Sequence, residues 1–238
     1  MEQRKKIVHV VEAFGGGIYT FLVDLLNDMI KDYELTVVYS KRSQTPENFK
    51  EHFDSRIKFI ESKYMARSIS SKDIKALFEI KNIIKNENPD IVHCHSSKAG
   101  LLTRVAVNTK KIKTIYTPHG YSFLMKDSSK LKRAIYKAIE KVGAMNRSTI
   151  VACSKGEYEE SLKLTKRATY VSNGVNLKHL KKYIPENIKD IDTENLTIVT
   201  TGRVSYQKNP MLFNKIAEKF PNIKFIWVGT GELEKELT

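Results

Sequence analysis

Short runs of β-branched and apolar residues alternate with segments of helical period, and this alternation limits the folds open to the chain. The strand-like runs cover residues 6–11, 34–39, 57–60, 90–94, 113–117, 149–153 and 168–172. The helical patterns cover residues 18–31, 73–86, 97–108, 129–145 and 155–164. A β-α-β-α order predicts an α/β domain with a parallel sheet and helices on both faces. The strands are almost continuously apolar, as expected of a sheet that is buried on both sides.

The alternation stops at residues 176–195, a polar stretch with one proline and no clean apolar period. We interpret this stretch as an interdomain linker. A second β-α-β unit follows, with strands expected at 196–201 and 223–228 and a helix at 209–219. Two strands do not form an independently stable sheet. The sequence therefore predicts an N-terminal domain over 1–178, a linker over 179–195 and the start of a second domain over 196–238.

We expect neither a membrane span nor a signal peptide in this sequence. No stretch approaches the roughly 18 consecutive apolar residues of a membrane span. The basic N-terminus leads directly into a strand-like run without a small-residue cleavage site, so we expect no signal peptide. The two cysteines, Cys94 and Cys153, lie in apolar strand-like runs. They exclude a disulfide framework and favour a reducing, cytoplasmic location.

Positive charge is concentrated in the middle of the sequence. The formal net charge is +14, and residues 91–156 contribute +11 of it through 13 basic and two acidic residues. Such a patch attracts an anionic partner, which could be a nucleic acid, an anionic membrane surface or a phosphorylated substrate. A solvated lysine-rich face is the other interpretation. Because no nucleic-acid-binding motif is present, we expect no nucleic acid partner.

Three glycines, Gly15, Gly16 and Gly17, separate the first expected strand from the first expected helix. Glycines there let a ligand approach the backbone closely, and a helix N-terminus attracts phosphate. A tight strand–helix turn is the alternative. No acidic residue ends the second strand, which disfavours a nicotinamide dinucleotide.

Histidines stand at the ends of two further expected strands. His93 and His95 are two residues apart and point to the same face, but we expect no partner cysteine or carboxylate for them from the neighbouring sequence, so a metal site is disfavoured. We expect one of them to bond within the sheet and the other to point towards a cleft. His119 lies between Pro118 and Gly120, which project it from a strand end, either as a ligand contact or as an ordinary surface turn.

The second unit carries a loop that suits phosphate. Arg203 and Lys208 flank the residues between its first strand and its helix, where Asn209 is the expected N-cap and Pro210 the first helical residue. Two cations beside a helix N-terminus suit a diphosphate. A glycine-rich turn at 228–232 follows the next strand.

One helical segment combines an apolar stripe with flanking cations. Within 129–145, the stripe consists of Leu131, Ile135, Ile139 and Val142, and the cations are Lys130, Lys132, Arg133, Lys137 and Lys141. The segment either docks on an anionic membrane or buries its stripe in the domain.

Taken in order, these segments resemble the family 4 glycosyltransferases of the GT-B fold. The resemblance rests on the glycine loop, D-I-V-H-C-H-S-S-K-A-G at 90–100, T-P-H-G-Y-S-F at 117–123, A-C-S at 152–154, V-S-N-G-V-N at 171–176, T-G-R-V-S-Y-Q-K-N-P at 201–210 and W-V-G-T-G-E at 227–232. The motifs S-S-K-A-G at 96–100 and T-P-H-G-Y-S-F at 117–123 are most similar to those of bacterial enzymes of capsular and extracellular polysaccharide synthesis.

The resemblance implies two Rossmann-like domains with a cleft between them, a nucleotide-sugar donor that is usually UDP-linked, and retention at the anomeric carbon. It implies neither a metal nor a cofactor. It implies His119 as the catalytic histidine at the donor sugar, and Arg203 and Lys208, with Gly16 and Gly17, at the donor diphosphate. Cations there stabilise the leaving group.

The same resemblance implies where the other substrate binds. A lipid-linked or saccharide acceptor is expected at His95, Ser97, Lys98 and Tyr121, and further cleft positions at Ser154, Asn173, Gly202, Gly229 and Gly231. A lipid-linked acceptor implies a cytoplasmic enzyme that is peripheral at the inner face of the cell membrane.

The resemblance implies an E-x7-E pattern further along the second domain, and the given residues stop before that region. Glu232, Glu234 and Glu236 come too early and are wrongly spaced. We therefore expect either part of a longer transferase or a truncated, non-catalytic homologue that acts as a binding module. In both cases we expect negligible transferase activity from the 238 residues alone.

Overall fold

The computed structural model describes residues 4–66, 68, 70–126, 128–175, 177 and 196–237. The chain divides into two compact units, Met1–Asn176 and Leu177–Thr238, and each is described by itself. The predicted linker at 179–195 lies outside the described residues.

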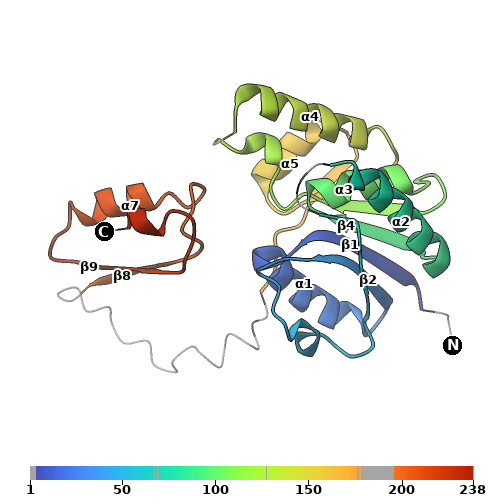
Figure 1. The fold of residues 1–238 in the computed structure, drawn as a ribbon, viewed down its shortest axis with the longest axis horizontal. Coiled ribbons are helices and arrows are strands. Elements are labelled where there is room, and N and C mark those ends of the chain that lie inside the picture. Colours follow the sequence, from blue (N-terminus) through green and yellow to red (C-terminus); the bar gives the residue numbers. More distant parts are fainter. Residues whose placement is uncertain are drawn as a thin grey trace. The chain divides into compact units, whose positions relative to one another are not determined.

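Unit 1 is built on a seven-stranded sheet in which every neighbouring pair runs parallel (Figure 1). Its strands are β1 (Lys6–Phe14), β2 (Glu34–Lys41), β3 (Lys58–Glu61), β4 (Ile91–His95), β5 (Lys113–Thr117), β6 (Thr149–Ala152) and β7 (Ala168–Tyr170). Their order in the sheet is β3-β2-β1-β4-β5-β6-β7, so the direction of winding reverses between β1 and β4. The predicted strands and the predicted parallel sheet are confirmed.

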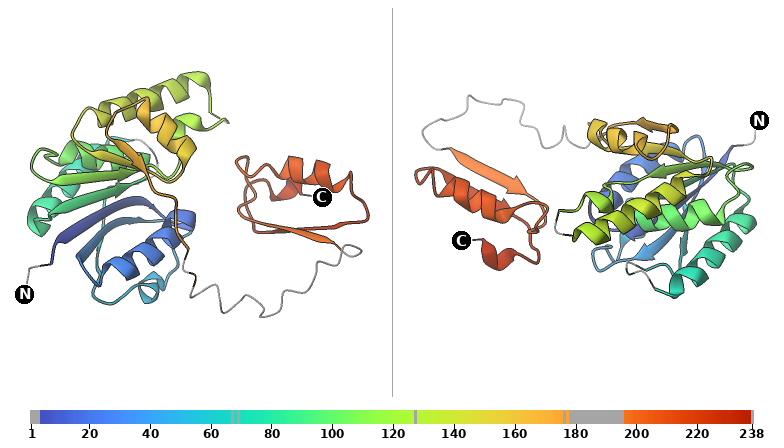
Figure 2. Two further views of the ribbon diagram at one scale, coloured as in Figure 1. Left: turned by 180° about the vertical axis from the view of Figure 1, so that it is seen from behind. Right: turned by 90° about the horizontal axis from the view of Figure 1, so that it is seen from above.

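Helices cover both faces of this sheet. Helix α1 (Gly16–Met29) lies on one face, and α2 (Lys72–Glu87), α3 (Ser97–Ala106) and α4 (Lys130–Ala144) lie on the other (Figures 1 and 2). Helix α5 (Lys155–Leu162) packs beside β6 and β7. Short 3-10 turns at Phe49–His52 and Ser122–Leu124 complete the unit. No helix among the described residues is long and apolar enough to span a bilayer.

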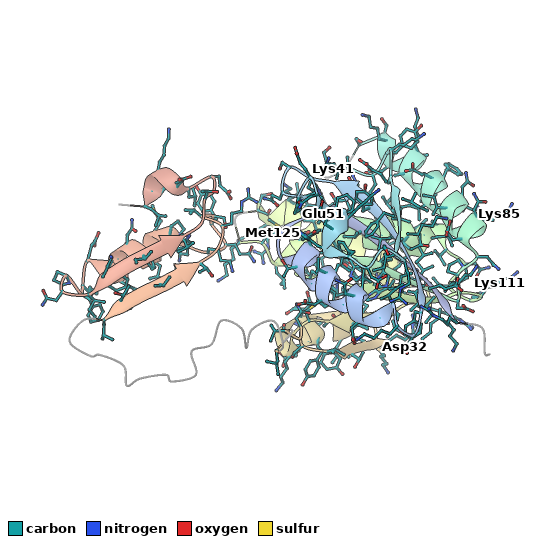
Figure 3. All side chains as sticks on the ribbon, turned by 90° about the horizontal axis from the view of Figure 1, so that it is seen from below. Asp32, Lys41, Glu51, Lys85, Lys111 and Met125 are labelled. Carbon is teal, nitrogen blue, oxygen red and sulfur yellow. The ribbon has the colours of Figure 1, made fainter. Side chains whose placement is uncertain are left out.

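An apolar cluster fills each side of the sheet. The cluster under α1 includes Phe14, Leu22 and Leu26, and the cluster under α2 and α3 includes Ile80 and Val92. Successive strand residues face opposite clusters because side chains alternate across a strand. Charged side chains project outward from the helices and turns, as Lys85 and Lys111 do in Figure 3.

A buried ionic network joins α3, α4 and β5. The guanidinium of Arg104 lies 2.8 Å from a carboxylate oxygen of Glu140, and the Tyr116 hydroxyl donates to the other oxygen at 2.8 Å. All three side chains are at most 2% exposed. Gly100 and Gly143 make room for the network, because a Cβ at either position would meet Tyr116 or Arg104 at 2.3 and 2.6 Å. The network fixes which side of α4 faces the core.

Unit 2 contains β8 (Thr197–Thr201), α7 (Pro210–Ala217), β9 (Lys224–Val228) and a 3-10 turn at Glu234–Glu236. The two strands are parallel. Phe213 of α7 packs its ring edge against Phe225 and Trp227, at centroid distances of 5.6 and 5.2 Å. The predicted β-α-β order of this segment is confirmed.

Replacing Glu140 by Ala should destabilise the protein by about 3–5 kcal/mol, because the buried guanidinium of Arg104 is left without its counter-ion. Urea unfolding followed by circular dichroism measures this loss. Glu159→Ala, an exposed glutamate on α5, should change the free energy of unfolding by less than about 0.5 kcal/mol. Equal effects of the two substitutions would contradict the role of the network.

Candidate functional site

The functional segments gather at the edge of unit 1 where the parallel strands end. The glycine loop follows β1, Ser96 follows β4, His119 follows β5 and Cys153 follows β6. The winding reverses between β1 and β4, and open α/β sheets bind ligands outside the carboxyl ends of the strands at such a reversal. This edge is therefore the candidate site of unit 1.

The glycine loop opens α1 as the sequence predicts. Gly15 is the N-cap, and Gly16 has φ 55°, in the left-handed region that favours glycine. A Cβ added at Gly17 would meet no heavy atom within 4 Å. The backbone at the start of α1 is therefore open to a ligand at this point.

A line of hydrogen-bonded imidazoles runs along the α1 face of the sheet to this edge. Nδ1 of His9 lies 3.1 Å from Nε2 of His95, and Nδ1 of His95 lies 3.1 Å from Nε2 of His119. Nδ1 of His119 lies 3.5 Å from the sulfur of Cys153. Beside the line, Nε2 of His93 bonds the Thr117 hydroxyl at 2.8 Å. His9 and His95 are fully buried.

Burial keeps these imidazoles neutral. It lowers the pKa of His9 to about 3 and that of His119 to about 4, and it holds the pKa of His95 well below its usual value. Burial also raises the pKa of the Cys153 thiol to about 11, so the sulfur is protonated at neutral pH.

The buried end of this line is His9, and its surroundings determine which ring nitrogen of each histidine carries the proton. Nε2 of His9 is buried and has no hydrogen-bond partner among the described residues. Because an orphaned buried N–H is strongly disfavoured, that nitrogen carries no proton, and Nδ1 of His9 donates to His95. Each ring then donates outward from Nδ1. His119 consequently presents an Nδ1–H towards Cys153.

The same histidines offer a metal only a poor site. Ligand nitrogens of His9, His93 and His95 lie within 4.8 Å of one another. Both nitrogens of His95 already bond other histidines, so a metal would have to break one of those bonds. The histidine line therefore fits a hydrogen-bonded network better than a metal centre.

Several residues expected at the acceptor bond other side chains of unit 1. His95 is buried between two histidines, so neither it nor half-buried His93 points freely into a cleft. Tyr121 is 2% exposed in the core, with its hydroxyl 2.8 Å from the Ser161 hydroxyl. The Lys98 ammonium pairs with Asp73 of α2 at 2.7 Å. Each of these side chains has a partner inside unit 1, and its role at the acceptor stays a prediction.

Three other predicted positions, Ser97, Ser154 and Asn173, follow the ends of β4, β6 and β7. The hydroxyls of Ser96 and Ser97, at the start of α3, are buried and have no partner among the described residues. Ser154 is the N-cap of α5 and accepts from the Glu157 amide at 3.2 Å. Asn173 is exposed beyond β7.

The sequence analysis did not single out His9, in the interior of β1, or Glu157, in the first turn of α5. The carboxylate of Glu157 accepts from the backbone amides of Gly120 and Cys153, each at 2.6 Å. A histidine inside an apolar strand is the signal for the first, because buried polar groups need partners. The S-x-x-E spacing of Ser154 and Glu157 is the signal for the second.

In unit 2, the loop between β8 and α7 presents the predicted cations. Arg203 pairs with Glu232 at 2.9 Å, and both side chains are about half exposed, at 51% and 46%. Lys208 is exposed, and its stem passes beside Gly202. Asn209 caps α7 by accepting from the Leu212 amide at 3.2 Å, which confirms the predicted N-cap.

The glycine turn after β9 packs directly on this loop. A Cβ at Gly229 would lie 2.1 Å from the Gly202 carbonyl oxygen, and one at Gly231 would lie 2.1 Å from the Val204 carbonyl oxygen. The Val204 amide donates to the Thr230 carbonyl at 3.0 Å. Only glycine allows this approach, and it holds the two strand-end loops of unit 2 together.

Comparison with known proteins identifies the family of this chain. Residues 15–179 match the family model described as Glycosyltransferase Family 4. The UDP-Gal:α-D-GlcNAc-diphosphoundecaprenol α-1,3-galactosyltransferase of Escherichia coli is 30% identical over 73% of this chain and 49% of the relative. An uncharacterized 41.2 kDa protein in the cps region of Klebsiella pneumoniae is 30% identical over 85% of this chain and 56% of the relative. The chain thus spans about half the length of these relatives.

A solved structure agrees on the fold. Anabaena HepE, in complex with UDP and glucose, superposes with a TM-score of 0.66 at 13% identity, over 98% of this chain and 63% of that protein. The parallel sheet of unit 1, the strand-end loops and the family match lead to the same conclusion. The chain belongs to Glycosyltransferase Family 4 and has the GT-B type of α/β fold.

Proposed function

We propose that this chain is part of a retaining glycosyltransferase that moves a sugar from a UDP-linked donor to a lipid-linked or saccharide acceptor during synthesis of a bacterial cell-surface polysaccharide. The observation that carries the proposal is the β8–α7 loop, where Arg203 and Lys208 stand exposed beside the capped start of a helix. The names of the galactosyltransferase and of the HepE complex, with UDP-galactose, diphosphoundecaprenol and UDP, support the substrate classes.

The chemistry of the β8–α7 loop suits a departing diphosphate. Breaking the bond between sugar and phosphate leaves charge on the diphosphate, and fixed cations stabilise that charge in the transition state. The exposed pair of Arg203 with Glu232 contributes little stability, so the guanidinium can exchange the carboxylate for a phosphate, which it binds with two parallel hydrogen bonds. We propose that these cations act without a metal or cofactor.

We propose that His119 of unit 1 donates a hydrogen bond from its Nδ1–H to the donor sugar. Its Nε2 is held by His95 at 3.1 Å, whereas the partner of Nδ1 among the described residues is the Cys153 thiol at 3.5 Å. A sulfur is a weak acceptor, so a sugar hydroxyl or carbonyl oxygen can replace it at little cost.

Replacing Arg203 by Ala in the full-length protein should weaken UDP binding by about 10- to 150-fold, since one charged hydrogen bond contributes about 1.5–3 kcal/mol. Calorimetric titration with UDP measures the change. Lys224→Ala is the matched control. This lysine begins β9, whereas the glycine turn that packs on the β8–α7 loop follows the other end of that strand. Unchanged affinity of the Arg203 variant would count against the diphosphate site.

The alternative function is a binding module without turnover. Full-length protein, a UDP-sugar and a polyprenyl-diphosphate acceptor carrying one sugar provide the test. The proposal expects a new glycosidic bond with the anomeric configuration of the donor, read from the proton coupling constant of the product. Donor binding without any product would favour the binding module.

We propose a peripheral membrane location on the strength of helix α4. Its buried residues are Glu140, Gly143 and Ala144. Of the predicted stripe, Ile139 is half-buried and the other three residues are exposed. Leu131 is 73% exposed, Ile135 50% and Val142 59%. Contiguous exposed apolar residues between cations are typical of surfaces that bind membranes. A different side of α4 borders a pocket of about 440 Å³, which is lined by Lys130, Arg133, Lys137 and Lys163, together with Phe123, Leu124, Ala134 and Glu160.

Replacing Lys130, Lys132, Arg133 and Lys137 together by Gln should lower binding to anionic vesicles at least 100-fold, because each cation contributes about 1 kcal/mol near an anionic surface. Co-sedimentation with vesicles of graded phosphatidylglycerol content measures the binding. Added salt should weaken it, since attraction is screened over about 8 Å at physiological ionic strength.

Helix α2 supplies the matched control for this membrane test. It also carries exposed apolar side chains, Ile74 at 65% and Phe78 at 56%, and four exposed lysines, Lys72, Lys75, Lys81 and Lys85. Replacing these four lysines by Gln removes the same charge and should leave vesicle binding near the wild-type value. Binding that ignores both salt and the α4 substitutions would remove the membrane proposal.

A further inference from the structure

A single buried carboxylate joins two neighbouring strand-end loops of unit 1. Glu157, in the first turn of α5, is 8% exposed. One of its oxygens accepts from the Gly120 amide and the other from the Cys153 amide, each at 2.6 Å. Gly120 belongs to the turn after β5, and Cys153 follows β6. The side chain therefore bridges the ends of adjacent strands.

Capping of α5 does not account for this bridge. Ser154 is the N-cap, and its own hydroxyl accepts from the Glu157 amide. In a capping box, the acidic side chain at this spacing returns to the amide of the N-cap residue. Here one oxygen instead bonds the residue before the cap, and the other leaves the helix for a different loop. The second bond serves the turn after β5.

That turn adopts a conformation that needs outside support. His119 has φ 53° and Gly120 has φ 98°. A left-handed backbone at a residue other than glycine is strained, and it persists only where its surroundings fix it. The Gly120 amide is the N–H of the peptide that immediately follows His119. A charge-assisted bond to this amide fixes the strained peptide directly.

The carboxylate also holds the partner of the imidazole. It bonds the amide of Cys153, and the sulfur of the same residue lies 3.5 Å from Nδ1 of His119. The backbone of His119 and the neighbour of its Nδ1–H are thus fixed by one side chain. His95 holds the opposite ring nitrogen.

We propose that Glu157 is the positioning residue of the His119 site: its carboxylate keeps the turn after β5 left-handed and keeps Cys153 beside Nδ1, so that the imidazole has one orientation. Glu157 does not touch the substrate. The consequence for sugar transfer rests on the proposed function, whereas the orientation of His119 belongs to this chain in any case.

The test replaces Glu157 by Gln and observes the His119 ring by NMR in the 238-residue chain. Glutamine keeps the size of the side chain, but its NH2 group faces one of the two amides and cannot accept from it. Loss of a signal in His119→Asn assigns the ring. In the wild type, burial holds the pKa of His119 at about 4.

In Glu157→Gln, the turn should open, and the pKa of His119 should rise by about one unit or more towards its usual value. Glu159→Gln is the matched control, since it makes the same change at an exposed site of α5. Ser161→Ala weakens α5 through a different contact, the bond to Tyr121. Both controls should leave the pKa and the ring shifts of His119 at their wild-type values.

Thermal unfolding confirms that each variant is folded. If Glu157→Gln does not fold, Glu157→Asp replaces it, because its shorter side chain cannot reach both amides. An unchanged His119 signal in the folded variant would overturn the proposal, and so would an equal shift in Ser161→Ala. The measurement needs no turnover, so a failed transferase assay leaves it intact.

In full-length protein with transferase activity, Glu157→Gln should lower kcat about tenfold or more and change the donor KM by less than about threefold, the pattern of a group that acts in the transition state. Glu159→Gln should retain the wild-type kcat. An unchanged kcat in Glu157→Gln would overturn the catalytic consequence.

Discussion

Parallel hydrogen bonding between the seven strands of unit 1 is the constraint on which the rest of the structure depends. Because every strand runs in the same direction, all their carboxyl ends lie at one edge of the sheet. That edge collects segments that are more than 130 residues apart in sequence, from the glycine loop at Gly15 to Cys153. The sheet thus brings these loops together, and the loops carry the functional side chains.

Two networks of buried polar side chains lie on opposite faces of this sheet. His95 is hydrogen-bonded to both His9 and His119 on the α1 face. On the other face, the carboxylate of Glu140 accepts from both Arg104 and Tyr116. A buried polar group without a partner is costly, so each network tolerates few rearrangements. The first network orients a candidate catalytic group, and the second sets the rotation of α4.

The rotation of α4 links the core to the membrane proposal. Glu140, Gly143 and Ala144 face inward because the carboxylate must reach Arg104 and a Cβ at position 143 would meet its guanidinium. The stripe with Leu131 and Val142 is then left on the surface. Because α4 buries the charged Glu140, it exposes Leu131 on its other side. The result is an apolar surface flanked by cations.

The sequence by itself determined the strands, the helices, the parallel sheet, the glycine loop at the start of α1 and the cap of α7 at Asn209, because periodicity and local backbone preference act over a few residues. Only the tertiary structure decided that His95 bonds two other histidines, that Tyr121 lies in the core, that Lys98 pairs with Asp73 and that the α4 stripe faces outward. Each of these outcomes depends on which side chain of a distant element comes within about 3 Å, the reach of a hydrogen bond. The order of the strands and the rotation of the helices determine which side chains meet. Neither can be predicted from a pattern of a few neighbouring residues.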